Sequence, residues 1–266
     1  MQWIYELQQR NALLFWYGLL CFVGGIVCAL FTKTTNIQVN HINAFIKPMK
    51  FFFSVWLFCF TMGWLVFELQ QPSIANSYSL MVVIVMSIEL IIITWQAANG
   101  RLSHFNISSA LYRSLFMLMG IAITVLTAWT LYIGYQFFTI QPATIPLGYL
   151  WGIRLGIICF VIFAFEGGMM GARLSHTIGA ADGSEGLPIV NWSKQYGDLR
   201  IAHFFGMHAL QLLPLAGYFI FRKSSGIIMV SAIYFVLVSV MLVRALKGLP
   251  LVKPTQAAPS IITEKV

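Results

Sequence analysis

Seven apolar runs, each about 20 residues long, constrain the fold of this chain more than any other feature. A helix of about 20 residues spans the roughly 30 Å hydrocarbon core of a bilayer, so each run is long enough to cross a membrane. Lipid offers no hydrogen-bond partners to the backbone, and a spanning segment of this kind must therefore be helical. The pattern predicts an all-α, polytopic transmembrane helical bundle with seven spans, at residues 12–31, 50–68, 78–97, 111–138, 151–171, 201–221 and 226–246.

The composition of the chain supports a membrane protein. Apolar residues make up 59% of the 266 residues and charged residues only 9%, whereas charged residues make up about a quarter of a typical soluble domain. Because the seven runs occupy most of the sequence, we expect residues 1–250 to form a single transmembrane domain and residues 251–266 to form a flexible cytoplasmic tail. This leaves little room for a separate soluble domain.

The Lys and Arg residues are distributed unevenly between the two sides of the predicted bundle. Four of the 16 fall in segments on the side of the N-terminus, and the other 12 fall on the opposite side. Since cytoplasmic loops carry the excess of Lys and Arg, we expect the N-terminus outside and the C-terminus inside the cell. The lipid bilayer accounts for the net charge of +8, because basic residues also attract anionic headgroups. The pattern predicts no nucleic-acid partner and does not indicate an oligomeric state.

All five histidines gather in or beside three of the segments that link the apolar runs. These three segments alternate along the chain, and alternate loops of a membrane bundle emerge on the same side. They are also longer and richer in polar residues than the other connections. We therefore expect any chemistry to take place at the cytoplasmic face, where the histidines would lie: His41, His104, His176, His203 and His208.

Ionisable residues inside the predicted spans are costly and indicate function or pairing. Glu89 and Gln96 are seven residues apart, so they share one face of the third run, and Glu166 and Arg173 share a face of the fifth run in the same way. Each carboxylate has two interpretations. Glu89 is either a catalytic or proton-carrying group or a hydrogen-bonded tie between helices, and Glu166 with Arg173 is either catalytic or a structural ion pair.

The first functional hypothesis is a haem- or metal-binding redox protein. Imidazole is a ligand for haem iron and for transition metals, and His104 and His208 are the leading ligands for haem b or a metal ion, with His203 as a replacement. The spacing of five between His203 and His208 places them about 140° apart on a helix, so that pair cannot hold one ion from a single face. The other residues expected to bind a cofactor are Trp95, Gln96 and Asn106.

Two further hypotheses remain open. In a proton-coupled transporter or channel, Glu89, Gln96, Glu166 and Arg173 would line a pathway and the histidines would relay protons; the scarcity of polar residues in the outer halves of the spans argues against it. In a lipid- or quinone-modifying enzyme, a cytoplasmic pocket would admit a small apolar ligand or quinone from the membrane, with a histidine and a carboxylate as acid and base. The sequence does not decide whether the protein is an enzyme.

Several residues have structural interpretations. Asp182 lies in a turn-rich stretch, ADGSEGLP, and Asp198 is placed to cap the sixth long helix by accepting from the amide of Arg200 or Ile201. We expect Arg154 to extend to the outer headgroups. Three glycines in the fifth run would allow close helix approach: Gly167, Gly168 and Gly171. The four cysteines lie in apolar runs without a C-x-x-C spacing, as core residues do: Cys21, Cys28, Cys59 and Cys159.

Several specific catalytic motifs are absent from the sequence. It has no Walker A motif, no G-x-S-x-G and no H-x-x-x-H series, and the last run lacks the central lysine that retinal would need. The stretches RLSHFN and DGSEGLPIVNWSKQYGDLRIAHFFGMHALQ resemble segments of uncharacterised polytopic membrane proteins of bacteria. The resemblance implies a bacterial inner-membrane location and carries no function.

Overall fold

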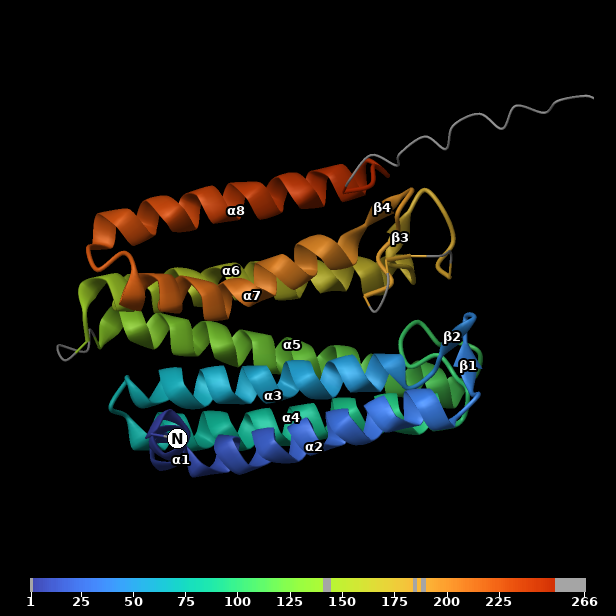
Figure 1. The fold of residues 1–266 in the computed structure, drawn as a ribbon, viewed down its shortest axis with the longest axis horizontal. Helices are drawn as coiled ribbons and strands as arrows, with labels where there is room; N and C mark the ends of the chain where they lie inside the picture. The colour runs from blue at the N-terminus through green and yellow to red at the C-terminus, as the bar shows by residue number, and fades with distance from the viewer. Residues whose placement is uncertain (1, 141–144, 184–185, 188–189, 252–266) are drawn as a thin grey trace, which may run out of the picture.

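The computed structural model describes residues 2–140, 145–183, 186–187 and 190–251, and within them the chain is a bundle of long helices (Figure 1). The predicted tail lies outside the described residues from residue 252 onward. The long helices run side by side, and the connections between them lie at the two ends of the bundle. This arrangement confirms the all-α fold class predicted from the apolar runs.

Each predicted run corresponds to one long helix, and a short helix precedes the first of them. The bounds are α1 Gln2–Arg10, α2 Ala12–Thr34, α3 Ile46–Phe67, α4 Pro72–Ala98, α5 Ala110–Thr139, α6 Leu147–Arg173, α7 Leu199–Phe219 and α8 Ser224–Leu246. Six of the described helices, α2 to α6 and α8, are long and apolar enough to cross a membrane, whereas α7 is outside that set. The chain is thus a multi-pass membrane protein, and its seventh span and its orientation stay predictions.

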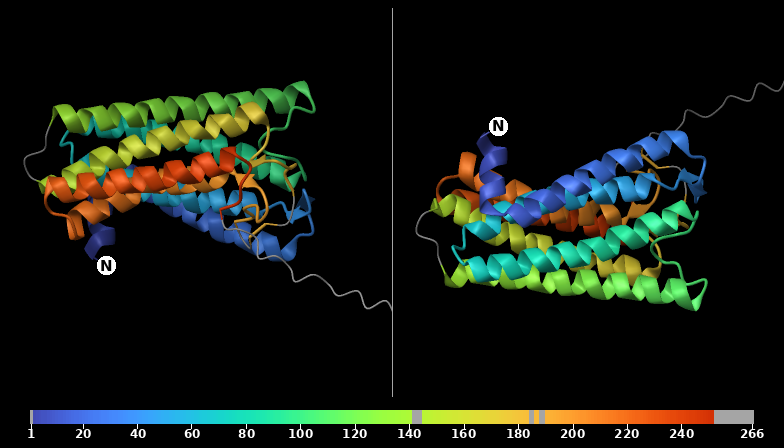
Figure 2. Two further views of the ribbon diagram at one scale, coloured as in Figure 1. Left: turned by 90° about the horizontal axis from the view of Figure 1, so that it is seen from above. Right: turned by 90° about the horizontal axis from the view of Figure 1, so that it is seen from below.

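The three segments that carry or adjoin the histidines lie together at one end of the bundle (Figure 1). One contains the hairpin of β1 Gln38–Val39 and β2 Ile42–Asn43, the second is residues 99–109, and the third contains β3 Thr177–Ile178 and β4 Gly197–Asp198. Strands β3 and β4 are antiparallel, with Thr177 opposite Asp198. We call this the histidine end. The opposite end, which we call the N-terminal end, holds α1, which is inclined to the long helices (Figure 2).

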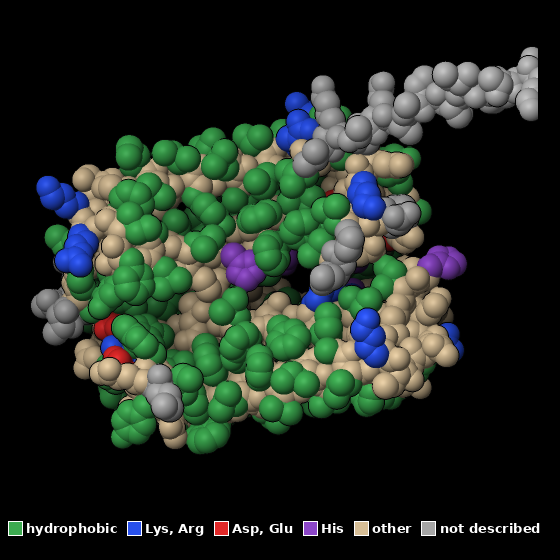
Figure 3. Space-filling view, in the orientation of Figure 1, with side chains coloured by type: hydrophobic (Ala, Val, Ile, Leu, Met, Phe, Trp, Pro, Cys, Tyr) green, Lys and Arg blue, Asp and Glu red, His purple; other side chains and the backbone are tan. Residues whose placement is uncertain are grey.

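Hydrophobic side chains cover most of the middle of the face seen in Figure 3, and Lys and Arg side chains lie toward its two ends. This distribution fits a bundle whose middle lies in the hydrocarbon core of a bilayer. The same face is hollowed between its upper and lower halves, and a histidine side chain lies beside the hollow.

Helices α6 and α7 pack backbone against backbone. Gly148, Gly152 and Gly156 recur every four residues along α6, and a Cβ added at any of them would lie 2.1–2.9 Å from a backbone carbonyl oxygen at or just beyond the C-terminal half of α7. Only glycine allows that approach. The sequence prediction placed close approach at the other end of α6, at Gly167, Gly168 and Gly171. It holds at Gly167, where an added Cβ would lie 2.8 Å from the imidazole of His203. It does not hold at Gly168, where an added Cβ would meet no atom within 4 Å, or at Gly171, where it would meet only Phe116 at 3.8 Å.

Arg154 is buried in the bundle, whereas the sequence predicted that it extends to the headgroups. Its Nε and Nη2 atoms donate to the carbonyl oxygen of Phe137 at 3.0 and 2.8 Å. The physical reason is that the last carbonyls of a helix lack intrahelical partners, and α5 ends at Thr139. The rings of Phe138 and Trp151 flank the guanidinium and shield it from lipid.

The sequence indicated few polar residues in the half of the bundle toward the N-terminal end. The core there nevertheless contains polar contacts. The Nδ2 atom of Asn11 donates to Oγ of Ser79 at 2.8 Å, and the hydroxyls of Tyr78 and Thr130 are 2.8 Å apart. The four cysteines are buried and free, as the sequence predicted.

Candidate functional site

His176 and Asp182 form a hydrogen-bonded pair at the histidine end. The Nδ1 atom of His176 lies 2.8 Å from Oδ2 of Asp182. A carboxylate can only accept, so Nδ1 carries the proton and Nε2 is left as the basic nitrogen. The carboxylate also accepts from the backbone amides of His176 and Thr177 and from the hydroxyl of Ser175. These bonds fix the position of the carboxylate and, through it, that of the imidazole ring.

The local sequence explains why this pair forms. Leu174 ends α6 in the left-handed conformation, with a φ of 52°, and Gly179 and Gly183 take φ values above 100°. Positive φ turns the chain sharply and is cheap only for glycine. The chain therefore folds back between β3 and Asp182, which brings the carboxylate over the amides that precede it.

Hydrogen bonding and burial oppose each other at this pair. Burial alone would raise the pKa of Asp182, but the bonds that it accepts from the His176 side chain and backbone hold that pKa well below its usual value. Burial lowers the pKa of His176; the bond to Asp182 offsets part of the change, and the charge of Arg200 adds to it. The imidazole of His176 is therefore neutral near pH 7 and can accept a proton.

A second histidine lies close to the first. The ring centroid of Phe105 is 4.7 Å from that of His176 and 6.3 Å from that of His104. The ring of His104 also packs against Phe51 of α3 and Phe116 of α5. Burial lowers the pKa of His104 well below its usual value, and the nearby Lys47 contributes to that shift. Both imidazoles are thus neutral and adjoin a wall of phenylalanine rings.

Two charged residues on helices complete the group that we call the histidine cluster: His104, His176, Asp182, Lys47 and Glu89. Lys47 is on α3 and Glu89 on α4, and the two side chains are within electrostatic range of each other. Glu89 is buried, with 5% of its surface exposed. The Nζ atom of Lys47 is 5.9 Å from the ring centroid of Phe51, which also contacts His104. A lysine, a carboxyl group and two neutral imidazoles thus converge from α3, α4 and the two polar segments.

The predicted cofactor residues of α4 have different positions. Gln96 is fully buried: its Nε2 atom donates to the carbonyl of Ser103, and its Oε1 atom accepts from Nδ2 of Asn106, both at 3.4 Å. These two residues tie segment 99–109 to α4 and hold His104 in place. Trp95 is exposed and packs on Tyr112.

Glu166 lies beside His203 of α7, while Arg173, its predicted partner, is exposed. The Oε2 atom of Glu166 is 3.4 Å from Nδ1 of His203, and that nitrogen donates to the carbonyl of Phe163 at 2.7 Å. Neither carboxyl oxygen of Glu166 has a hydrogen-bond partner among the described residues. Gly167 makes the approach of α7 possible, because a Cβ there would meet the imidazole of His203 at 2.8 Å.

His208 lies further along α7 and is linked to α3. Its Nδ1 atom is 3.1 Å from Oε1 of Gln211, whose Nε2 atom donates to Oγ1 of Thr61 at 3.1 Å. The spacing of three residues puts His208 and Gln211 on the same face of α7, where this hydrogen bond can form. The ring of Phe204 packs on the imidazole at 4.3 Å.

Among the described residues, no three His, Cys, Asp or Glu side chains are grouped so that they could hold a metal ion. Comparison with models of protein families, with curated proteins and with solved structures finds no match. That result is consistent with the uncharacterised family that the RLSHFN stretch indicates, and a bacterial source stays a prediction. The function has to be inferred from the site alone.

Sequence reasoning missed Lys47 and underestimated the pair of His176 and Asp182. Lys47 was counted only for the orientation of the chain, and Asp182 was assigned to turn chemistry. The signal for the pair was a histidine six residues before an aspartate with a glycine between them. The Asp198 cap was predicted correctly, since the carboxylate accepts from the amide of Arg200 at 3.1 Å.

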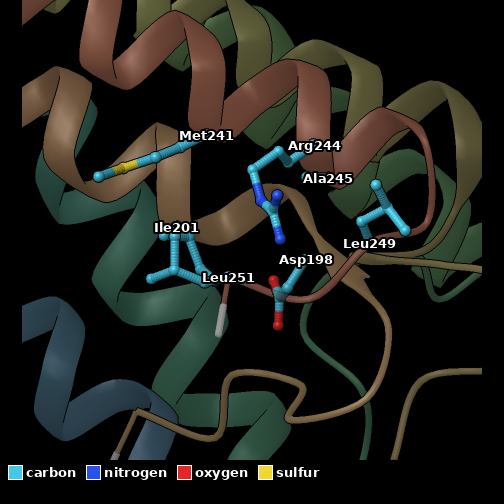
Figure 4. Close-up of a pocket in the computed structure, with 7 residues that line it drawn as sticks. All are labelled: Asp198, Ile201, Met241, Arg244, Ala245, Leu249 and Leu251. Carbon is cyan, nitrogen blue, oxygen red and sulfur yellow. The ribbon is translucent and has the colours of Figure 1, made fainter. Parts of the chain in front are cut away.

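A small cavity lies behind this cap, between α7, α8 and the chain that follows α8 (Figure 4). The guanidinium of Arg244 points toward Asp198 across it. Its volume of about 10 Å³ is close to the minimum for one water molecule. It is therefore too small for a substrate.

Proposed function

We propose that the protein is a membrane enzyme that carries out acid–base chemistry on an amphiphilic substrate, a lipid or a quinone, at the histidine cluster. The observation that carries the proposal is the 2.8 Å contact between Nδ1 of His176 and Oδ2 of Asp182. A carboxylate that holds one imidazole nitrogen fixes the tautomer and leaves the other nitrogen as the general base. The lowered pKa of His176 supports this role, because the ring is uncharged and ready to accept a proton.

The surroundings of the pair support a substrate that is partly apolar. The rings of Phe51, Phe105 and Phe116 give an apolar wall beside the two imidazoles. His176 would take a proton from a hydroxyl, or from a carbon next to a carbonyl, of the substrate. Lys47 would stabilise the oxygen anion that this step leaves, since a cation held in a site of low polarity acts strongly on developing charge.

The test compares the wild type with two substitutions of the pair and one matched control. Purified protein is placed in liposomes of total lipid from its host membrane, and lipids and quinones are followed by mass spectrometry. With the wild type, we expect the amount of one lipid or quinone to change with time. H176N should lower the rate of this change by a factor of about 10²–10⁴, and D182N should lower it less.

The control is H41N. His41 is exposed at the same end of the molecule and has a φ of 63°, a conformation that asparagine tolerates. H41N should therefore leave the rate unchanged. A wild type that changes no lipid or quinone, or a change that proceeds equally with H176N, would contradict the proposal.

Proton-coupled transport is the second candidate, and the buried Glu166 is the observation that favours it. Its oxygens lack hydrogen-bond partners among the described residues, and it adjoins His203. A buried carboxyl without partners is suited to take up and release a proton. Proton flux in proteoliposomes that E166Q abolishes, together with lipids that stay unchanged, would favour transport. An absorption spectrum of the same sample tests the haem hypothesis, because bound haem gives a Soret band.

A further inference from the structure

A cavity at the N-terminal end has no part in the proposed chemistry. Its volume is about 500 Å³, and its walls come from α1, the turn after α3, the start of α6 and the end of α7. Cavities that bind small molecules have volumes of roughly 300–1,000 Å³. Arg10, Phe67, Glu68, Tyr149 and Tyr218 are among the residues that line it. We call it the N-terminal cavity.

The only cation among those five residues is already paired with two carboxylates. The Nε and Nη2 atoms of Arg10 donate to Oε1 of Glu6 at 3.0 and 2.8 Å, and its Nη1 atom donates to Oε1 of Glu68 at 2.5 Å. One guanidinium and two carboxylates leave a net charge of −1 beside the cavity. An anionic ligand would be repelled there, and a cationic ligand would be attracted.

Aromatic rings in this region already hold a cation. The guanidinium carbon of Arg10 lies 4.1 Å from the ring centroid of Trp64 and 4.8 Å from that of Phe67. The rings of Tyr149 and Tyr218, 5.4 Å apart and edge to face, form another part of the wall. Aromatic faces next to a carboxylate are the groups that recognise quaternary ammonium ions in proteins.

We propose that the N-terminal cavity binds an organic cation of the quaternary ammonium type, held by Glu68 and by the rings of Tyr149 and Tyr218. A quaternary ammonium group can come from two sources: a free cation in solution or the choline headgroup of a lipid. Helix α1 beside the cavity exposes Trp3, Ile4 and Tyr5 and buries Leu7, a pattern that suits a helix lying in the membrane interface. A cavity beside such a helix would adjoin both the lipid headgroups and the aqueous phase.

The first experiment measures the effect of charge at constant shape. Choline and 3,3-dimethylbutan-1-ol have nearly the same shape, but only choline carries a charge. The full-length protein is purified in a detergent without a choline headgroup, and the binding of each compound is measured by calorimetry. We expect choline to bind at least about tenfold more tightly than the alcohol, because only choline gains from the carboxylate and the ring faces.

Three variants locate the binding. E68Q removes the negative charge at nearly constant shape and should weaken choline binding about tenfold or more. Since E68Q also removes a partner of Arg10, Y218L and Y218F provide a second test in which that ion pair is intact. Tyr218 is 42% exposed, so its replacement leaves the core packed. Y218L, which removes the ring, should weaken binding, and Y218F, which keeps it, should not.

A second experiment separates the two sources. The protein is reconstituted in nanodiscs of mixed phosphatidylcholine and phosphatidylglycerol, and the lipids that remain bound after extraction are analysed by mass spectrometry. Enrichment of phosphatidylcholine that Y218L abolishes identifies the lipid headgroup as the ligand; choline binding without such enrichment identifies a free cation. Absence of choline binding, equal binding of the uncharged alcohol, or choline binding that neither E68Q nor Y218L weakens would overturn the proposal.

Discussion

Gly152 of α6 lies directly against the backbone carbonyl of Leu213 of α7, so that a Cβ on Gly152 would come within 2.4 Å of that oxygen. Backbone cannot move aside as a flexible side chain can. The contact lies between two similar ones, at Gly148 and Gly156. The closest helix packing in the protein is thus set by residues that have no side chain.

Substitution G152A should lower the thermal unfolding midpoint of the protein in detergent. The added methyl group forces α6 and α7 apart, and overpacking of this kind costs about 1–3 kcal/mol of unfolding free energy, or more where only backbone surrounds the site. Substitution G168A is the matched control on the same helix, because nothing lies within 4 Å of its Cβ. It should be neutral or stabilising by about 0.5–1 kcal/mol. Equal destabilisation by the two would show that the close packing is not at Gly152.

Substitution R154K should also destabilise the protein. Lysine keeps the charge but cannot donate twice to the carbonyl of Phe137 or stack between Phe138 and Trp151 as the planar guanidinium does. A hydrogen bond from a charged group is worth about 1.5–3 kcal/mol, and part of that should be lost. The exposed Arg222 supplies the control, and R222K should leave the unfolding midpoint unchanged. A midpoint for R154K equal to that of the wild type would mean that the bidentate contact does not contribute.

The rate of the proposed reaction should fall as the pH falls through the pKa of His176, because the base must be neutral. That pKa lies below 6.5, since burial lowers it more than Asp182 raises it. D182N removes the raising interaction. It should therefore move the acid limb of the rate profile to lower pH while it lowers the maximal rate, because the ring loses the group that fixes its tautomer. An acid limb that moves to higher pH with D182N would contradict the assignment.

Stability should also fall on mild acidification. The pKa of His104 is lowered in the folded state by burial and by the charge of Lys47, so below pH 6.5 the unfolded chain binds a proton that the folded chain does not. Asp182 acts in the same direction but in a lower pH range: its lowered pKa contributes stability that is present above pH 3.8 and is lost below it. The thermal midpoint should therefore drop between pH 7 and pH 5, and H104N should reduce that slope. An unchanged slope would show that His104 does not control it.

The helices could be predicted from sequence because a bilayer leaves the backbone no alternative, and the bounds agree to within six residues. Contacts within one helix turn were also predictable, as for Asp198 with Arg200 and for His208 with Gln211. Contacts between helices could not be predicted from the sequence. Glu166 lies beside His203 because Gly167 lets α7 approach, and that depends on the packing of two helices.

The candidate site was predicted in part. The gathering of the three polar segments at one end of the bundle was predicted, and the segment that carries His104 lies there. A functional role for that end stays a proposal. The pair of His176 and Asp182 depends on positive φ at Leu174, Gly179 and Gly183. The spacing of apolar residues in the sequence does not reveal these backbone conformations. The N-terminal cavity combines residues from four separate elements, so only the three-dimensional arrangement could show it.

The tight packing of α6 on α7 has a mechanical consequence. Tyr149 and Tyr218 on these two helices line the N-terminal cavity, while Arg200 at the start of α7 and His176 just beyond α6 lie at the opposite end. Because the two helices pack backbone against backbone, we expect them to move as one rigid unit. With 27 residues, α6 is about 40 Å long, so a tilt of about 5° at one end displaces the other by about 3.5 Å. Such a displacement exceeds the length of the hydrogen bond between His176 and Asp182.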